Sequence, residues 1–234
     1  MTAIILALAL AANTPTAIDA ERAFARDSQR IGQWSAFRKY ALPDAVMFTP
    51  QAVFAEDFLK GRKDPPALLD WWPNRSFVSC DRRTAVNFGP WVRSGGKSRG
   101  FFTTVWQRDG RSWRWAYDGG GEGWSGKLPP RNQASIHRAR CTKAPGAPVI
   151  PPLPLTDKQA RKTPVDSGRG ESADKTLGWD WKVDKDGSRH FRVFLWNGVR
   201  YAQAFYQHVP ASGPASGPAS GPAPNPAPDP TKTQ

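Results

Sequence analysis

The chain has 234 residues, a formal net charge of +13 and 39% hydrophobic residues, including 11 Trp and 12 Phe. This length allows one or two domains, and the aromatic content is sufficient for a packed core. The basic residues are spread along the chain, whereas a nucleic-acid groove needs them clustered. The composition therefore predicts a globular protein that does not bind nucleic acid.

The N-terminal segment is an apolar run from Ala3 to Ala12, followed by Asn13-Thr14-Pro15. Ten residues are too few to cross a bilayer, but they fit the apolar region of a signal peptide. No Lys or Arg precedes the run, and a buried N-terminal helical turn or strand is the alternative. We expect residues 1–17 to be a signal peptide with cleavage near residues 11–17. The protein is then periplasmic or secreted, with no transmembrane segment after cleavage.

The two cysteines, Cys80 and Cys141, lie far apart in the sequence. In an oxidising compartment an isolated pair of this kind predicts a disulfide. The bond would close a loop of about 60 residues. Two unrelated thiols are the alternative.

The first third of the chain has helical character. Apolar residues recur at helical spacing over residues 18–40, with Gly32 as a point where the segment can split into two helices. Ala45–Thr49 is typical of a short buried strand. Asp64-Pro65-Pro66 has the pattern of a helix start and predicts a short helix that ends at Pro73.

From Ser76 onward the pattern changes to strands, and its clearest element is the stretch Phe101–Gly119. β-branched and aromatic residues flank Asp109-Gly110, which predicts a hairpin. Strict alternation places Trp113, Trp115 and Tyr117 on one face of the second strand and Asp118 on the other. Helices followed by tightly connected strands predict an α+β fold.

Residues 122–175 are rich in Gly and Pro and are predicted to be a linker, with a possible short helix near Asp157–Lys162. Residues 176–209 contain Asp186-Gly187 and Asn197-Gly198, two hairpin turns that predict a three-stranded β-meander docked on the first domain. The Pro/Ala/Ser/Gly segment 210–234 is expected to be a disordered tail.

Residues 18–121 resemble the nuclear transport factor 2-like superfamily, in its SnoaL-like branch. The resemblance lies in these stretches: Gly32-Gln33-Trp34, Asp44–Phe48, Gly61 before Pro65–Trp72, Ser79-Cys80-Asp81, Gly89-Pro90-Trp91, and Thr103–Gly110 with Trp113. It implies helices that cap a curved antiparallel sheet and form a cone with a pocket, often in a homodimer. Members include isomerases, cyclases and dehydratases as well as modules without activity, so the fold alone does not define the chemistry.

Few residues in this chain are candidates for catalysis. The histidines that the SnoaL-like branch usually carries near the strand end are replaced by Tyr117 and Gly119, and the remaining candidates are Asp118 as a base and Tyr117 as a donor. Asp81 is expected to stabilise a tight turn, and Asp27 is expected to form an ion pair with Arg26 or Arg30. His137, His190 and His208 lack metal-ligand spacing, so we predict no metal and no cofactor.

The abundant aromatic residues predict a binding function. We expect a non-catalytic exported module that binds a small apolar molecule or an envelope component in the cone, through Trp34, Tyr40, Trp71, Thr103, Trp113, Trp115 and Tyr117. One alternative is a cofactor-free isomerase or cyclase with a buried carboxylate base. Another is a polysaccharide-binding envelope protein, which would need an exposed row of Trp on the meander.

Overall fold

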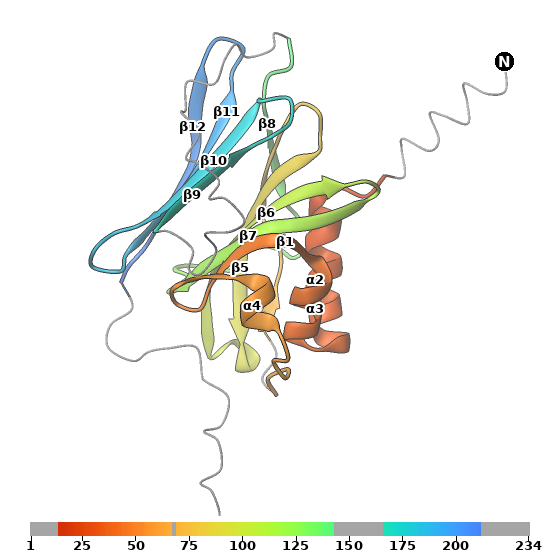
Figure 1. Cartoon of the computed structure of the whole chain (residues 1–234), viewed down its shortest axis with the longest axis vertical. Helices are drawn as coiled ribbons and strands as arrows, with labels where there is room; N and C mark the ends of the chain where they lie inside the picture. Colours follow the sequence, from red (N-terminus) through yellow and green to blue (C-terminus); the bar gives the residue numbers. More distant parts are fainter. Residues whose placement is uncertain (1–13, 67–68, 143–165, 212–234) are drawn as a thin grey trace, which may run out of the picture.

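The computed structural model describes residues 14–66, 69–142 and 166–211, and it shows three layers (Figure 1). Helices cover one face of a large sheet, and a smaller sheet covers the other face. The helical elements are α2 (Ala17–Ile31), α3 (Gln33–Tyr40), α4 (Ala55–Leu59) and the 3-10 turn η1 (Ser94–Gly96). Residues 1–13 and 212–234, and the helix expected near residues 157–162, lie outside the described part of the chain.

The large sheet has eight strands in the order β2-β1-β7-β6-β5-β4-β8, with β3 paired to β5. Its strands are β1 (Ala41–Phe48), β2 (Ala52–Phe54), β3 (Leu69–Trp71), β4 (Arg75–Val78), β5 (Thr84–Arg93), β6 (Ser98–Asp109), β7 (Ser112–Glu122) and β8 (Ser135–Arg138). The sheet is mixed, which corrects the expectation of a purely antiparallel one. β1 is parallel to β7 and β4 is parallel to β8, because long connections separate the members of each pair.

The small sheet has four antiparallel strands in the order β12-β11-β10-β9. They are β9 (Ser167–Glu171), β10 (Leu177–Val183), β11 (Arg189–Trp196) and β12 (Tyr201–Val209). The three predicted strands and both hairpin turns are present, and β9 adds a fourth strand. The sheet packs on the large one through a shared apolar layer, as the sequence led us to expect.

Two strands lie within the segment predicted to be a linker. β8 is exposed along its whole length and is held by backbone pairing to β4, so it carries no apolar pattern. β9 contains Gly168 and Gly170, where a Cβ atom would stand within 2.6 Å of the indoles of Trp181 and Trp179, respectively. Glycine at these two positions therefore allows the indole rings to pack directly on the backbone of β9, and its role here is not backbone flexibility.

The helix predicted after Asp64 is replaced, in its described part, by β3. The Asp64 carboxylate instead caps α3, since it accepts hydrogen bonds from the Ser35 backbone N–H at 2.9 Å and from the Ser35 hydroxyl at 2.6 Å. Gly32 separates α2 from α3 with a φ of +100°, as its position in the sequence suggested. The predicted hairpin at Asp109-Gly110 joins β6 and β7. No helix in the described ranges has both the length and the apolar character needed to cross a membrane.

The predicted disulfide between Cys80 and Cys141 is present, with the two Cα atoms 5.5 Å apart. It joins the segment that follows β4 to the segment that follows β8. Nearby backbone contacts hold the same region to the small sheet, because Cys80 N–H donates to the Thr176 hydroxyl at 2.8 Å and Arg140 N–H to the Trp196 carbonyl at 2.7 Å. The bond therefore lies where β4, β8 and the small sheet meet.

Replacing both cysteines by serine should lower the free energy of unfolding by about 4 kcal/mol, since the bond closes a loop of about 60 residues in the unfolded chain. Urea denaturation at neutral pH measures the change, and wild-type protein held reduced should give the same curve. Coincident curves for the double variant and the oxidised wild type would contradict this role.

Candidate functional site

A buried carboxyl group lies at the centre of the helical layer. Glu21 is completely buried, and its two oxygens accept hydrogen bonds from Trp71 Nε1 at 2.9 Å, Trp106 Nε1 at 2.6 Å and Asn87 Nδ2 at 3.2 Å. Three donors on β3, β5 and β6 thus converge on one side chain of α2. Such convergence is what a buried carboxyl needs to remain in an apolar layer.

The local sequence explains how Glu21 reaches this place. Thr16 and Asp19 form a capping box that starts α2, and the helix presents a buried stripe at helical spacing. The stripe consists of Ala17, Ala20, Glu21, Phe24, Ala25 and Ser28. Glu21 lies within the apolar stripe, and this placement is the signal that could have identified it from the sequence.

A second carboxyl group, that of Asp118 on β7, belongs to the same layer and keeps some exposed surface. Thr104 on the neighbouring strand β6 donates its hydroxyl to Asp118 Oδ2 at 3.0 Å. The charge of Glu21 also acts on Asp118, so the two carboxyl groups influence each other's ionisation.

Burial changes the ionisation of both acids. It raises the pKa of Glu21 to about 7, despite the opposing effect of its indole and amide donors. It raises the pKa of Asp118 to about 8, and the charge of Glu21 acts in the same direction. At neutral pH the pair therefore holds at least part of its protons and can both donate and accept hydrogen bonds.

A β-bulge decides which side chains face these acids. In the pairing of β6 with β7, Val105 lies opposite Tyr117 but Trp106 lies opposite Trp115, so Ala116 is an extra residue. The bulge reverses the alternation after Trp115. It turns Asp118 toward the helical layer and Tyr117 toward the small sheet.

The residues predicted to bind a ligand are consequently divided between two layers. Five of them lie in the helical layer: Trp34, Tyr40, Trp71, Trp113 and Trp115. The other two face the small sheet, where Thr103 donates to Gln207 Oε1 at 3.1 Å and the Tyr117 ring lies 4.7 Å from that of Phe191. The expectation that Tyr117 shares a face with Trp113 and Trp115 is wrong, because it assumed an unbroken strand.

The two other predicted acids, Asp27 and Asp81, have structural roles. Asp27 pairs with Arg30 at 3.0 Å, as expected, and also accepts hydrogen bonds from Lys39 and from the Tyr40 hydroxyl. The Lys39 hydrogen bond is the main reason why the pKa of Asp27 falls to about 2. Asp81 closes its turn by accepting from the Ser79 hydroxyl at 2.6 Å.

Several polar atoms of the helical layer are buried and unpaired among the described residues. They are Trp115 Nε1, Asn87 Oδ1 and Ser28 Oγ. Aromatic rings surround them, with the Phe24 ring 4.9 Å from Trp71 and 5.9 Å from Trp106. Within residues 14–66, 69–142 and 166–211, no group of three or more His, Cys, Asp or Glu side chains could hold a metal ion.

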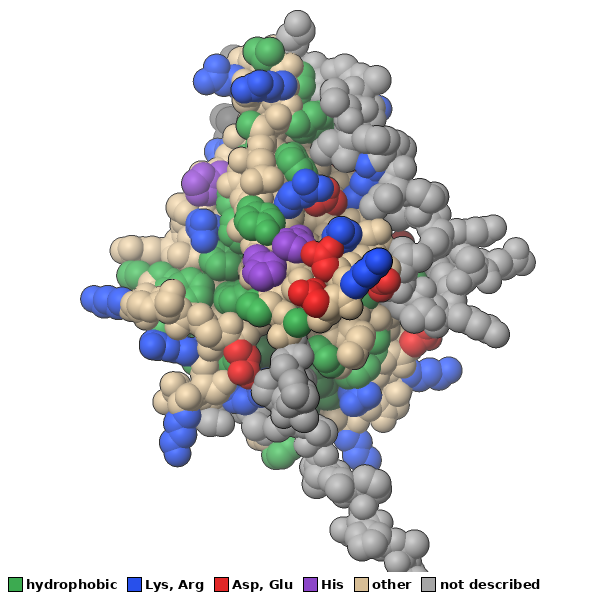
Figure 2. All heavy atoms as spheres, turned by 90° about the vertical axis from the view of Figure 1, so that its left-hand side faces the viewer, with side chains coloured by type: hydrophobic (Ala, Val, Ile, Leu, Met, Phe, Trp, Pro, Cys, Tyr) green, Lys and Arg blue, Asp and Glu red, His purple; other side chains and the backbone are tan. Residues whose placement is uncertain are grey.

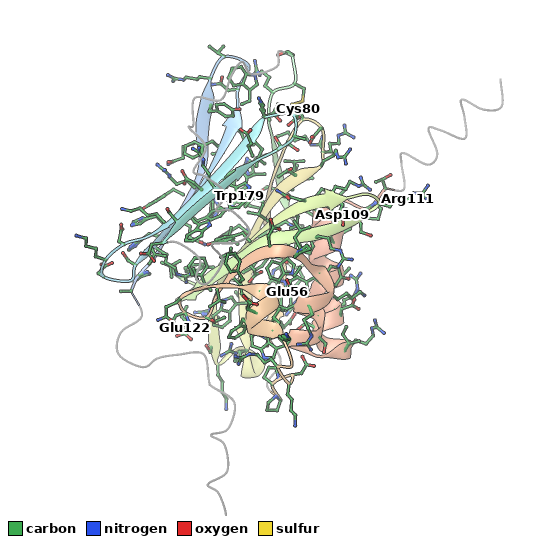
Figure 3. All side chains as sticks on the ribbon, viewed as in Figure 1. Glu56, Cys80, Asp109, Arg111, Glu122 and Trp179 are labelled. Atoms are coloured by element: carbon green, nitrogen blue, oxygen red, sulfur yellow. A yellow bond between two sulfur atoms is a disulfide. The ribbon has the colours of Figure 1, made fainter. Side chains whose placement is uncertain are left out.

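The tryptophans of the small sheet are also buried. Trp179, labelled in Figure 3, and Trp181 face the large sheet in the layer between the sheets, and both are less than a tenth exposed. The described meander therefore lacks the exposed tryptophan row that the polysaccharide alternative required.

The comparisons with known proteins concern the fold. No family model matches the chain, and no curated protein matches it. Among solved structures, the chain is similar to a DUF3225-family protein of unknown function from Pectobacterium atrosepticum, with 14% identity over 46% of this chain and 91% of that one and a TM-score of 0.35. It is also similar to a candidate ketosteroid isomerase from Kribbella flavida, with 14% identity over 54% of this chain and 95% of that one and a TM-score of 0.28.

These similarities are too distant to carry an argument about activity. The observed architecture is an α+β protein with helices on one face of a large mixed sheet. The nuclear transport factor 2-like superfamily and its SnoaL-like branch stay a prediction.

Proposed function

We propose that the helical side of the large sheet binds a small, mostly apolar molecule, and that Asp118 recognises an oxygen atom of that molecule. The observation that supports this most strongly is the position of Asp118, a partly exposed carboxyl that accepts a hydrogen bond from the Thr104 hydroxyl beside the aromatic layer. Burial raises the pKa of this carboxyl to about 8. A carboxyl that is protonated at neutral pH can donate a hydrogen bond to an oxygen atom, and buried neutral aspartic acids act in this way in enzymes that stabilise an enolate. Trp34 and Tyr40, the partly exposed aromatic side chains among the predicted ligand-binding residues of this layer, would supply apolar surface, because Trp71, Trp113 and Trp115 are buried in the core.

Two further features support binding in this layer. Asp118 is partly accessible, whereas Glu21 is enclosed by its three donors. Trp115 Nε1 is buried without a partner in the described residues, and a polar ligand atom that entered the layer would supply its missing acceptor. We assign recognition to Asp118 and a supporting electrostatic role to Glu21.

A second candidate function is cofactor-free proton transfer, of the isomerase or cyclase type. The pKa values of Glu21 and Asp118, about 7 and about 8, favour it because general acid–base catalysis works best near the operating pH. In this reading Asp118 is the base and Thr104 positions it.

We further propose that the protein is exported to the periplasm or secreted. The Cys80–Cys141 disulfide supports this location, because such bonds persist in oxidising compartments.

Native mass spectrometry of the full-length protein, purified from the cells that encode it, tests the binding proposal. We expect a non-covalent adduct on the wild type and its loss from Asp118→Asn, which has similar shape but cannot offer a carboxyl proton. Glu122→Gln, at the exposed end of the same strand (Figure 3), is the matched control and should keep the adduct. Absence of an adduct from the wild type, or its retention by Asp118→Asn, would contradict the proposal.

The same material separates binding from catalysis. The released compound is incubated in D2O with catalytic amounts of each protein, and its mass is followed with time. Deuterium uptake with the wild type but not with Asp118→Asn would establish proton transfer, whereas no uptake with either protein leaves binding as the function.

A further inference from the structure

The outer face of the small sheet carries a groove that the proposed function does not use. Its volume is about 410 Å³, within the range of small-molecule sites. Its lining lies on all four strands and consists of Ser167, Asp180, Lys182, His190, Arg192 and Tyr206, which are at least partly exposed, and the buried Trp181. Figure 2 looks onto this face and shows histidines beside alternating acidic and basic side chains.

The strand register explains why these residues meet. One cross-strand row contains Ser167, Lys182, His190 and His208, and the next contains Arg169, Asp180, Arg192 and Tyr206. The intervening residues, such as Trp181 and Phe191, point to the opposite face and form the layer between the sheets. The groove is thus a rigid surface supported from behind by a packed core.

The charges of the groove are paired within it or at its edge. Arg192 binds Asp180 through two hydrogen bonds, at 2.8 and 2.6 Å, and Lys182 binds Asp184 at 2.6 Å. Because each lining cation has a carboxylate partner, an anionic ligand would gain little attraction here and would have to break these pairs. A neutral ligand that both donates and accepts hydrogen bonds suits such pairs better.

The rings of the groove are held in place by hydrogen bonds. His190 Nε2 lies 2.6 Å from Asp184 Oδ2, and His190 Nδ1 lies 2.7 Å from the Tyr206 hydroxyl. The Tyr206 ring is stacked at 5.8 Å from His190, and the His208 ring at 4.9 Å. Tyr206 is half exposed, so a fixed aromatic surface borders the groove and little side-chain freedom is lost on binding.

We propose that this groove binds a neutral saccharide. A sugar ring has an apolar face that can lie against an aromatic ring such as Tyr206, and hydroxyl groups that both donate and accept hydrogen bonds. The paired Asp180–Arg192 and the Lys182–Asp184 groups supply both kinds of partner.

Calorimetric titration of the full-length protein tests this proposal. The probes are maltotetraose, cellotetraose and chitotetraose as neutral saccharides, and inorganic phosphate and tetragalacturonate as anions. We expect saturable binding of at least one neutral tetrasaccharide and none of phosphate. Amide chemical shifts should change in β10, β11 and β12 and stay unchanged in α2.

Tyr206→Ala should weaken the binding of the neutral saccharide about tenfold, which is the effect expected from the loss of one aromatic contact. Tyr206→Phe keeps the ring and should retain most of the affinity. Gln203→Ala, an exposed position on the same strand, is the matched control and should bind as the wild type does. An unchanged melting temperature confirms that the half-exposed Tyr206 variants are folded.

Three results would overturn the proposal: no binding of any neutral tetrasaccharide, binding of the anions alone, or neutral binding that Tyr206→Ala leaves unchanged. Because the groove and Asp118 lie on different sheets, loss of the saccharide result would leave the Asp118 experiments unaffected.

Discussion

Replacing Glu21 by leucine should lower the free energy of unfolding by on the order of 5 kcal/mol. Leucine is of similar size but has no acceptor, so the indole N–H groups of Trp71 and Trp106 and the amide of Asn87 would be left buried and unpaired. Each unpaired buried donor costs about 1–3 kcal/mol, and the removal of a buried acid offsets part of the sum. Urea denaturation at pH 7, followed by Trp fluorescence, measures the loss.

Two variants separate this effect from other consequences of the substitution. Glu21→Gln keeps one acceptor oxygen and should lose less stability than Glu21→Leu. Arg26→Leu changes an exposed position of the same helix and should stay within about 0.5 kcal/mol of the wild type. If Glu21→Leu were as stable as Arg26→Leu, the three hydrogen bonds would not stabilise the helical layer.

Stability should fall as the pH rises from about 5 to about 8, which is the opposite of what most carboxylates produce. Glu21 and Asp118 have ordinary values of 4.5 and 3.8 but pKa values of about 7 and about 8 in the folded protein. Over this window the folded protein keeps protons that the unfolded chain has already lost. The stabilisation that these two protonated acids give is therefore complete below their ordinary pKa values and is lost as the pH approaches 8. Each unit of pKa change corresponds to about 1.4 kcal/mol, so the two acids together account for several kcal/mol.

Urea denaturation at closely spaced pH values checks this profile. Asp118→Asn is neutral throughout and should have a visibly flatter profile than the wild type, while Glu122→Gln should follow the wild type. Below about pH 4 stability should fall again, because the carboxylates of Asp27, Asp64 and Asp174 have lowered pKa values and become protonated. A wild-type curve that rises from pH 5 to pH 8 would show that Glu21 and Asp118 are not buried as acids.

Local patterns in the sequence correctly predicted much of the architecture. The Asp109-Gly110, Asp186-Gly187 and Asn197-Gly198 turns join strands where they were expected, because their φ > 0 positions depend on the residues themselves. The helical stripe before Gly32 and the pair Cys80–Cys141 were predicted in the same way. β8 and β9 were not predicted. β8 is held by backbone pairing to its neighbour and needs no apolar pattern, whereas the glycines of β9 lie against the indole rings of β10.

The candidate site was only partly predictable. Asp118 was identified as an acid at the strand end, but strict alternation placed Tyr117 with Trp113 and Trp115. Glu21 was not among the predicted site residues, because an acid near the start of a helix usually lies in solvent. Its burial depends on donors that lie 50, 66 and 85 residues further along the chain.

The sequence by itself determined the two N-terminal helices, the three hairpin turns and the pairing of the two cysteines, since residue types and their spacing indicate those features. Only the tertiary structure decided which side chains face the helical layer and which face the small sheet. A single extra residue, Ala116, reverses the alternation of β7, because the side chains of a strand repeat every two residues. That reversal brings Asp118 into the same layer as Glu21 and turns Tyr117 toward the second sheet.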